Sequence, residues 1–142
     1  PGNPVSEADL EVDRFLKREL RRLLPSAAWL SEETADDKLR TRSGLIWLVD
    51  PIDGTRDFVR GRDGWAVSVA LVSAGKPLIG MLAAPARGEE WIAVAGQGAT
   101  LNDAPITASR RTEFAGARVP THSLPKEDSD LVAVEQPNSS AR

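Results

Sequence analysis

Two aspartates stand three positions apart in the segment Asp50-Pro51-Ile52-Asp53-Gly54-Thr55. An apolar run, Leu45 to Val49, precedes the segment and is typical of a buried strand. Pro51 fixes one backbone angle, and Gly54 allows conformations that a Cβ would forbid. We therefore expect both carboxylates where a strand ends and the chain turns. Carboxylate oxygens suit Mg²⁺ and the free N–H groups of a helix start suit a phosphate, so the segment predicts metal-assisted phosphate chemistry.

The same chemistry requires further groups that the chain contains. A phosphatase with two metal ions needs carboxylates that bridge the ions, a group that activates water, and donors for the phosphoryl oxygens. Asp50 and Asp53 can bridge, and the main-chain carbonyl of Ile52 can add an oxygen ligand. Glu32 can bind a cation and hold the water, which the Thr55 hydroxyl can orient. The N–H groups that follow Asp53 can face the phosphate.

Composition and charge exclude several other classes of function. The 142 residues suffice for one domain with a core, and the formal net charge of −3 gives no footprint for nucleic acid or an anionic membrane. The chain has no cysteine, which excludes disulfides, cysteine-bound zinc and thiol catalysis and is compatible with a cytoplasmic protein. His122 is the single histidine, so a site with two histidines is excluded. No apolar run reaches the roughly 20 residues of a membrane helix.

The first residues predict an amphipathic helix. Ser6 is a good N-cap, and Asp9 three residues on completes a variant of the capping box. Pro25 is expected to stop the helix. Helical spacing places one set of apolar side chains on a single face, which we expect to be buried: Ala8, Val12, Phe15, Leu16, Leu20 and Leu23.

The rest of the chain predicts an α+β fold, an antiparallel sheet flanked by helices. Thr55 is expected to cap a helical turn over 56–60. Strands are expected at 45–49, 66–72, 78–84, 90–95 and from 99, and close neighbours should pair as antiparallel hairpins. Residues 1–109 would form the metal- and phosphate-binding domain. Residues 110–142 would begin an incomplete second α/β domain, with one isolated strand at 131–134.

The motif resembles the inositol monophosphatase superfamily, the lithium-sensitive and Mg²⁺-dependent sugar phosphatases. The resemblance rests on Glu32-Glu33 followed by Trp47 to Thr55, and it extends to 3–9, Trp65 to Val69, and Gly96 to Ala99 with Asn102. It covers nearly the whole chain and implies the N-terminal part of a layered αβαβα fold. It also implies that Glu32, Asp50 and the Ile52 carbonyl bind one Mg²⁺, and that Asp50 and Asp53 share in a second.

The same resemblance implies the remaining roles. Glu32 and Thr55 would activate the water, and Asp9 would act nearby as an acid or base, or contact a third cation through its outer shell. Asp53, Gly54 and Thr55 would contact the substrate. The substrate would be a small phosphorylated metabolite, adenosine 3',5'-bisphosphate or an inositol monophosphate, with water as the nucleophile. A homodimer is compatible with the sequence, whereas nucleic-acid and membrane partners are not expected.

The choice of branch rests on two short segments. Arg56-Asp57-Phe58 and Gly64-Trp65 are most similar to the bacterial branch that includes 3'(2'),5'-bisphosphate nucleotidases. Inositol monophosphatases and histidinol-phosphate phosphatases share the same core motif, so these substrates stay open.

One departure from the family suggests an alternative function. The family carries a Trp-Asp motif in its second domain, whose Asp completes the second metal site, and this chain contains no Trp-Asp pair. The resemblance therefore implies the front part of such an enzyme, which we expect to be a poor catalyst alone. The alternative is a non-catalytic or partner-dependent fragment that binds metal and phosphate. A haloacid-dehalogenase-type phosphatase is disfavoured, because its two aspartates are separated by one residue and not two.

Overall fold

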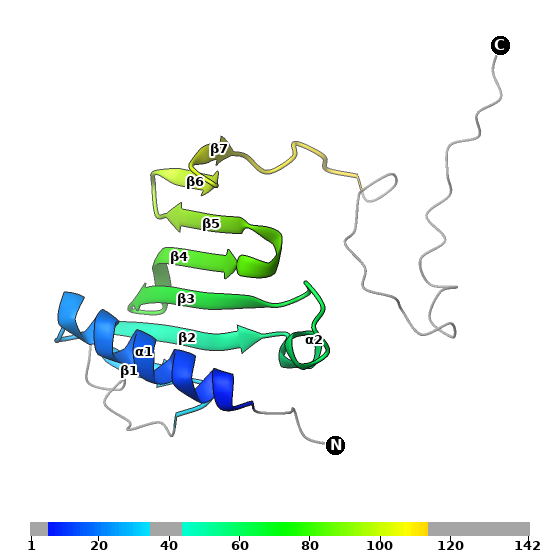
Figure 1. The fold of residues 1–142 in the computed structure, drawn as a ribbon. Coiled ribbons are helices and arrows are strands. Elements are labelled where there is room, and N and C mark those ends of the chain that lie inside the picture. Colours follow the sequence, from blue (N-terminus) through cyan, green and yellow to red (C-terminus); the bar gives the residue numbers. More distant parts are fainter. Residues whose placement is uncertain (1–5, 35–43, 114–142) are drawn as a thin grey trace, which may run out of the picture. The chain divides into compact units, whose positions relative to one another are not determined.

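The computed structural model describes residues 6–34 and 44–113, and the chain separates into two compact units, 1–107 and 108–142 (Figure 1). The expected strand at 131–134 and His122 lie outside the described residues, as does nearly all of the expected second domain. Among the described residues, no helix has the length and apolar character needed to cross a membrane. The fold described below is that of the first unit.

A single seven-stranded sheet forms the centre of the described unit, and its strands lie side by side in chain order (Figure 1). All neighbours from β2 onward pair antiparallel, as expected, whereas β1 and β2 pair parallel. The connection over 32–44 is long enough for the crossover that a parallel pair requires. The α+β class is confirmed, with a mixed sheet. The strands are β1 (Ala28–Ser31), β2 (Leu45–Asp53), β3 (Ala66–Ser73), β4 (Lys76–Ala84), β5 (Glu89–Val94), β6 (Gly98–Leu101) and β7 (Ala104–Ile106).

Within the described residues, three helical segments accompany the sheet: α1 (Glu7–Leu23), α2 (Thr55–Val59) and the short 3-10 turn η2 (Pro85–Arg87). The capping box of α1 is confirmed, since Ser6 and Asp9 exchange bonds between side chain and backbone. The expected buried face of α1 is partly wrong. Phe15 is 54% exposed and Leu23 is 75% exposed. The helix instead turns a stripe that begins with two aspartates toward the sheet.

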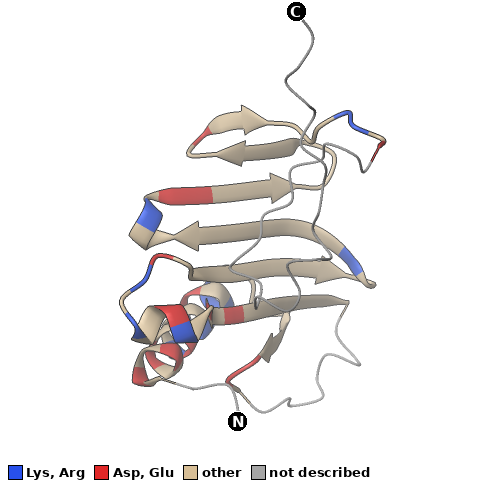
Figure 2. Cartoon of the chain, turned by 90° about the vertical axis from the view of Figure 1, so that its right-hand side faces the viewer, with Lys and Arg blue, Asp and Glu red and all other residues tan. Residues whose placement is uncertain are grey.

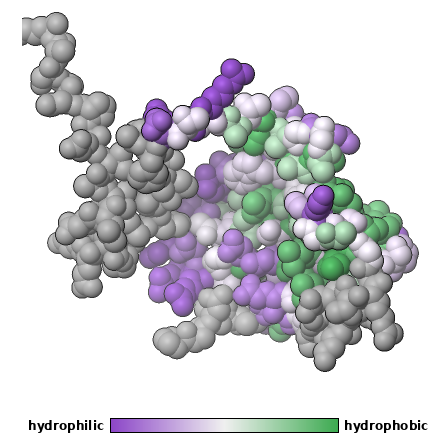
Figure 3. Space-filling view, turned by 180° about the vertical axis from the view of Figure 1, so that it is seen from behind, coloured by the Kyte–Doolittle hydropathy of each residue, from purple (hydrophilic) through white to green (hydrophobic). Residues whose placement is uncertain are grey.

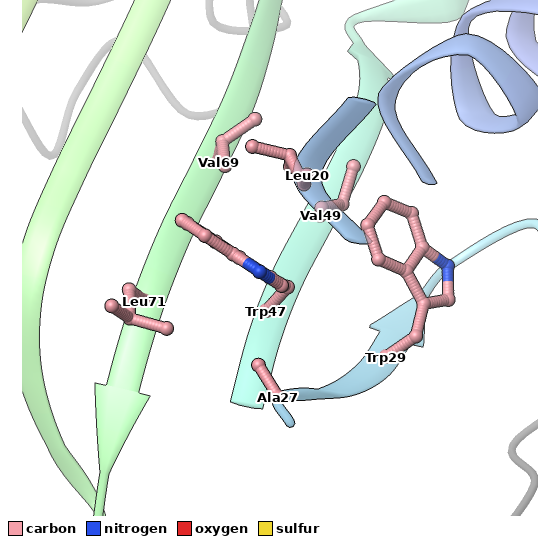
Figure 4. Close-up of a cluster of buried hydrophobic side chains, with 7 residues drawn as sticks. All are labelled: Leu20, Ala27, Trp29, Trp47, Val49, Val69 and Leu71. Atoms are coloured by element: carbon pink, nitrogen blue, oxygen red, sulfur yellow. The ribbon is translucent and has the colours of Figure 1, made fainter. Parts of the chain in front are cut away.

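The hydrophobic core lies between α1 and one face of β2 and β3 (Figure 4). The strands are in register with Trp47 opposite Leu71 and Val49 opposite Val69, so these alternate residues point to the same face. Leu20 from α1 and Trp29 from β1 complete the contacts, and Trp29 is only 2% exposed. This packing fixes α1 across the first strands and thereby positions its N-terminal turns.

The opposite face of the sheet is apolar but has no covering layer among the described residues (Figure 3). Leu30, Leu48 and Ala70 are neighbours on β1, β2 and β3, and they line one open cavity on this face. Leu82 and Trp91, paired across β4 and β5, line a second cavity. The site described below borders the first of these two cavities.

Replacement of Trp47 by alanine should destabilise the chain far more than replacement of its neighbour Leu48. Trp47 is 5% exposed in the core, so its loss should lower the free energy of unfolding by about 3–5 kcal/mol. Leu48 lies on the open face and is 46% exposed, so its replacement should lower the free energy of unfolding by less than about 1.5 kcal/mol. Urea denaturation followed by far-UV circular dichroism measures both. Equal losses would contradict the assignment of the core to the α1 side.

Candidate active site

The end of β2 departs from a regular strand at the two aspartates. We expected the strand to end at Val49, but it continues to Asp53 through an irregularity in its pairing with β3. Asp50 lies opposite Ser68 and Asp53 opposite Ala66, so β2 holds one more residue than β3 between these pairs. In a regular strand, residues three apart face opposite sides of the sheet. The bulge removes this constraint, so Asp50 and Asp53 can act on one region.

Gly54 gives the turn after β2 its shape. Its φ of +88° lies in the left-handed region, which favours glycine, and it is the N-cap residue of α2. A Cβ here would approach the backbone oxygen of Gly64 to 2.5 Å. The expectation that Thr55 caps this helix is wrong, because Thr55 is its first helical residue and no side chain caps it. The Thr55 hydroxyl is held elsewhere.

The Thr55 hydroxyl lies between two oxygens beneath the start of α1. It is 3.2 Å from Asp9 Oδ1 and 3.0 Å from the carbonyl oxygen of Ile52, and it can donate to either. Asp9 is 1% exposed and Thr55 is 7% exposed. The other Asp9 oxygen, Oδ2, accepts from the backbone N–H of Ser6 at 2.8 Å and from its hydroxyl. Three of the predicted site residues therefore meet directly.

Glu32 reaches the same edge of the sheet from β1. The parallel pairing of β1 with β2 brings the ends of both strands together, and the N–H of Glu32 donates to the Val49 carbonyl at 3.3 Å. Glu32 and Asp50 both line the open cavity of about 420 Å³, together with Leu30 and Leu48. A small molecule in this cavity would contact both carboxylates and an apolar wall.

The carboxylates at this edge repel one another. The pKa of Asp50 is raised to about 6, first by burial and then by the negative charges of Glu32 and Asp53 and a hydrogen bond with Glu32. Burial also raises the pKa of Glu33, with added repulsion from Asp9, Glu32 and Asp13. In Figure 2, acidic segments on α1, β2 and just after β1 lie near one another in the lower half of the view.

This donor set fits a hard divalent cation. Carboxylate and carbonyl oxygens are the ligands that Mg²⁺ prefers, and a cation would offset the repulsion that raises the pKa of Asp50. Within 6–34 and 44–113, however, no three Asp, Glu or His side chains stand close enough together to hold a metal ion by themselves. The structure thus brings the predicted ligands to one edge of the sheet without forming a closed metal cage.

One acidic residue at this edge was missed by the sequence analysis. Asp13 lies one helical turn after Asp9, is 5% exposed, and accepts a hydrogen bond from the Thr34 hydroxyl. Its spacing could have revealed it, because Asp9, Asp13, Leu16 and Leu20 recur at i, i+4, i+7 and i+11. The stripe was overlooked because its first two members are charged.

Substitution of Gly54 by alanine should destabilise the chain more than the same change at Gly61. Both glycines have positive φ, +88° and +65°, but a Cβ at Gly61 has nothing within 4 Å. We expect a loss of about 1 kcal/mol at Gly61 from backbone strain, and clearly more at Gly54 from the added clash. Equilibrium urea denaturation gives both values. Similar losses of stability would mean that the backbone at Gly64 moves away from the new Cβ at little cost.

Without metal ions, the chain should lose stability as the pH rises through the range from about 4 to about 6. The folded-state pKa of Asp50 is about 6 and its ordinary value is 3.8, so the folded state holds more protons in this interval. Stability from this group is therefore present at low pH and lost above the raised pKa. Asp50→Asn should flatten this dependence relative to wild type, in urea denaturation with a chelator present. Parallel pH profiles would contradict the raised pKa.

Comparison with known proteins assigns the chain to a family. The sequence model of the inositol monophosphatase family matches residues 1–139. Histidinol-phosphatase of Mycobacterium tuberculosis is 42% identical over 96 residues, which cover 68% of this chain and 36% of that protein. The 3'(2'),5'-bisphosphate nucleotidase CysQ of Aggregatibacter actinomycetemcomitans is 40% identical over 100 residues, which cover 69% and 37%.

Solved structures show the same fold. The extragenic suppressor protein SuhB from Bartonella henselae superimposes with a TM-score of 0.73 at 35% identity, covering 78% of this chain and 43% of that one. An IMPase/NADP phosphatase complexed with Mg²⁺ and phosphate gives 0.66 at 25% identity, covering 71% and 38%. The chain spans less than half the length of these four proteins. The chain belongs to the inositol monophosphatase family.

Proposed function

We propose that this chain carries the Mg²⁺- and phosphate-binding part of a phosphomonoesterase that hydrolyses a small phosphorylated metabolite with water. The observation that carries the proposal is the meeting of Asp9, Thr55 and the Ile52 carbonyl beside the carboxylates of Glu32 and Asp50. Acidic ligands and a positioned hydroxyl at one edge are what metal-assisted hydrolysis of a phosphate ester requires.

The metal ligands would be Glu32, Asp50, the carbonyl oxygen of Ile52 and, for a second ion, Asp53 with Asp50. The Ile52 carbonyl lies 3.0 Å from the Thr55 hydroxyl, and a carbonyl oxygen has a second lone pair for a cation even when it accepts from Thr55. Mg²⁺, when bound, supplies charge stabilisation for the phosphoryl oxygens and lowers the pKa of water. The presence of Mg²⁺ and phosphate in a related structure supports this choice of cofactor.

Thr55 and Asp9 would handle the proton of the attacking water. A Thr55 hydroxyl that donates to Asp9 keeps lone pairs with which it accepts a hydrogen bond from water. As the water loses its proton to Thr55, the Thr55 proton can pass to Asp9 Oδ1, 3.2 Å away. Glu32, which borders the cavity, would hold the water from the other side. The N–H groups of Gly54 and Thr55, with Asp53, would contact the substrate.

The names of the relatives narrow the proposed substrate to a few phosphate esters. Relatives named histidinol-phosphatase, bisphosphate nucleotidase and inositol-1-monophosphatase all match this chain. Adenosine 3',5'-bisphosphate and inositol monophosphate are our proposed candidates. The apolar wall of Leu30, Leu48 and Ala70 would face the part of the molecule that carries the phosphate.

Isothermal titration calorimetry with Mg²⁺ tests the metal site. The chain should bind Mg²⁺, and Asp50→Asn or Glu32→Gln should weaken binding at least about 10-fold, because each removes a charged oxygen ligand. Glu90→Gln is the matched control, since Glu90 lies on β5, away from β1 and β2, and carries the same charge. A wild-type chain that takes up no Mg²⁺ would overturn the proposed function.

Phosphate release separates the enzyme from its alternative, a non-catalytic fragment that binds metal and phosphate. The panel would contain adenosine 3',5'-bisphosphate, inositol 1-phosphate, fructose 1,6-bisphosphate and histidinol phosphate, with Mg²⁺ and then with added Li⁺. Turnover that depends on Mg²⁺ and falls at least about 100-fold in Thr55→Val supports hydrolysis by this site. Binding without turnover supports the fragment. We expect the 142-residue chain to fall below the ~1–10³ per second of ordinary enzymes.

A further inference from the structure

Helix α1 buries two carboxylates that lie one turn apart on its inner face. Asp9 is 1% exposed and Asp13 is 5% exposed. Residues four apart on a helix stand above one another, so both side chains point to the same edge of the sheet. Burial of a carboxylate is unfavourable unless polar partners compensate it. The partners of these two residues therefore indicate what the pair is for.

Each of the two carboxylates lies within hydrogen-bond distance of a threonine hydroxyl. Asp9 Oδ1 lies 3.2 Å from Thr55 Oγ1, and Asp13 Oδ2 accepts from Thr34 Oγ1. Thr55 follows Asp53 by two residues, and Thr34 follows Glu32 by two residues. The helix thus holds both acidic segments of the proposed metal site in the same way, one by each aspartate.

The segment after β1 has few other restraints among the described residues. The N–H of Glu32 donates to Val49 O and that of Glu33 to Ser31 Oγ, and both bonds are long at 3.3 Å. Glu32 also shares a side-chain hydrogen bond with Asp50. The Thr34 bond to Asp13 ties the segment to helix α1.

The second oxygen of Asp13 argues against a purely structural role. Asp13 Oδ1 is buried and has no hydrogen-bond partner among the described residues. An amide or a hydroxyl at this position could accept the Thr34 bond without burying a charge. Groups that break the usual rules of burial occur at sites where function requires them.

We propose that Asp13 is a positioning residue, which orients the Glu32 segment for metal binding through its hydrogen bond with Thr34. The inference rests on the proposed function, in which Glu32 is a metal ligand. Asp13 itself touches neither metal nor substrate in this proposal. Its role parallels the contact of Asp9 with Thr55, but on the other acidic segment.

The test uses four variants of the full chain. Thr34→Val removes the hydroxyl at nearly constant volume, and Thr34→Ser restores it. Asp13→Asn keeps an acceptor but removes the charge. Glu11→Gln is the control, because Glu11 is an exposed acidic residue on the same helix. Mn²⁺, which takes the same oxygen ligands as Mg²⁺, is titrated and its binding followed by electron paramagnetic resonance.

Thr34→Val should weaken Mn²⁺ binding by about 10-fold, in the range typical for partners that orient metal ligands. Thr34→Ser should restore Mn²⁺ affinity to within about twofold of wild type. The affinity of Asp13→Asn should lie between those of Thr34→Val and Thr34→Ser, because the amide keeps an acceptor for Thr34 but loses the charge. Glu11→Gln should bind like wild type. In the metal-free chain, the amide of Glu33 should exchange its hydrogen faster in Thr34→Val than in Thr34→Ser.

The outcomes separate this inference from the proposed function. If wild type binds Mn²⁺ and both Thr34→Val and Asp13→Asn bind equally well, the positioning role is overturned. If wild type binds no Mn²⁺, the proposed function fails. If the Glu33 amide then exchanges at the same rate in Thr34→Val and Thr34→Ser, the proposed role of Asp13 in holding the Glu32 segment is overturned as well. If Asp13→Asn does not fold, the comparison of Thr34→Val with Thr34→Ser still tests the positioning role.

Discussion

The contact between the Thr55 hydroxyl, Asp9 and the Ile52 carbonyl joins the start of α1 to the end of β2. The other half of α1 is held by apolar packing, through Leu20 against the tryptophans of the core. The helix is thus fixed by two kinds of interaction at its two ends. Polar contacts are strong in a buried environment only when they are satisfied, so the orientation of the helix and the arrangement of the site depend on each other.

Local patterns predicted most of the elements. The capping box at Ser6 and the hairpins from β3 to β6 depend on residues close together in the chain, so they could be predicted. The bulge between Asp50 and Asp53 could not, because only the pairing with β3 reveals the extra residue. The parallel β1 and the inward turn of Asp13 also depend on distant contacts. Phe15 was misplaced because apolar spacing was weighed without the two aspartates of the stripe.

The site violates the usual preferences for burial in a limited region. The face of β2 that packs against α1 is apolar up to the bulge, with Trp47 and Val49 buried. Asp50, the next residue, lines the cavity on the opposite face, where burial and the charges of Glu32 and Asp53 raise its pKa. A metal ion removes this repulsion only when it is bound. A Mg²⁺ ion bound as proposed would therefore add to the stability of the fold as well as supply chemistry.

The order of the strands has a consequence for how the molecule folds. From β3 to β7 each strand pairs with its neighbour along the chain over a short loop, so this part of the sheet can form stepwise. Asp9 and Thr55, by contrast, are 46 residues apart, and Asp13 and Thr34 are 21 apart. These closures cost more chain entropy and require α1 to be docked. A molecule that has formed its hairpins without docking α1 would have a sheet but no assembled site, so binding competence would arise late and all at once.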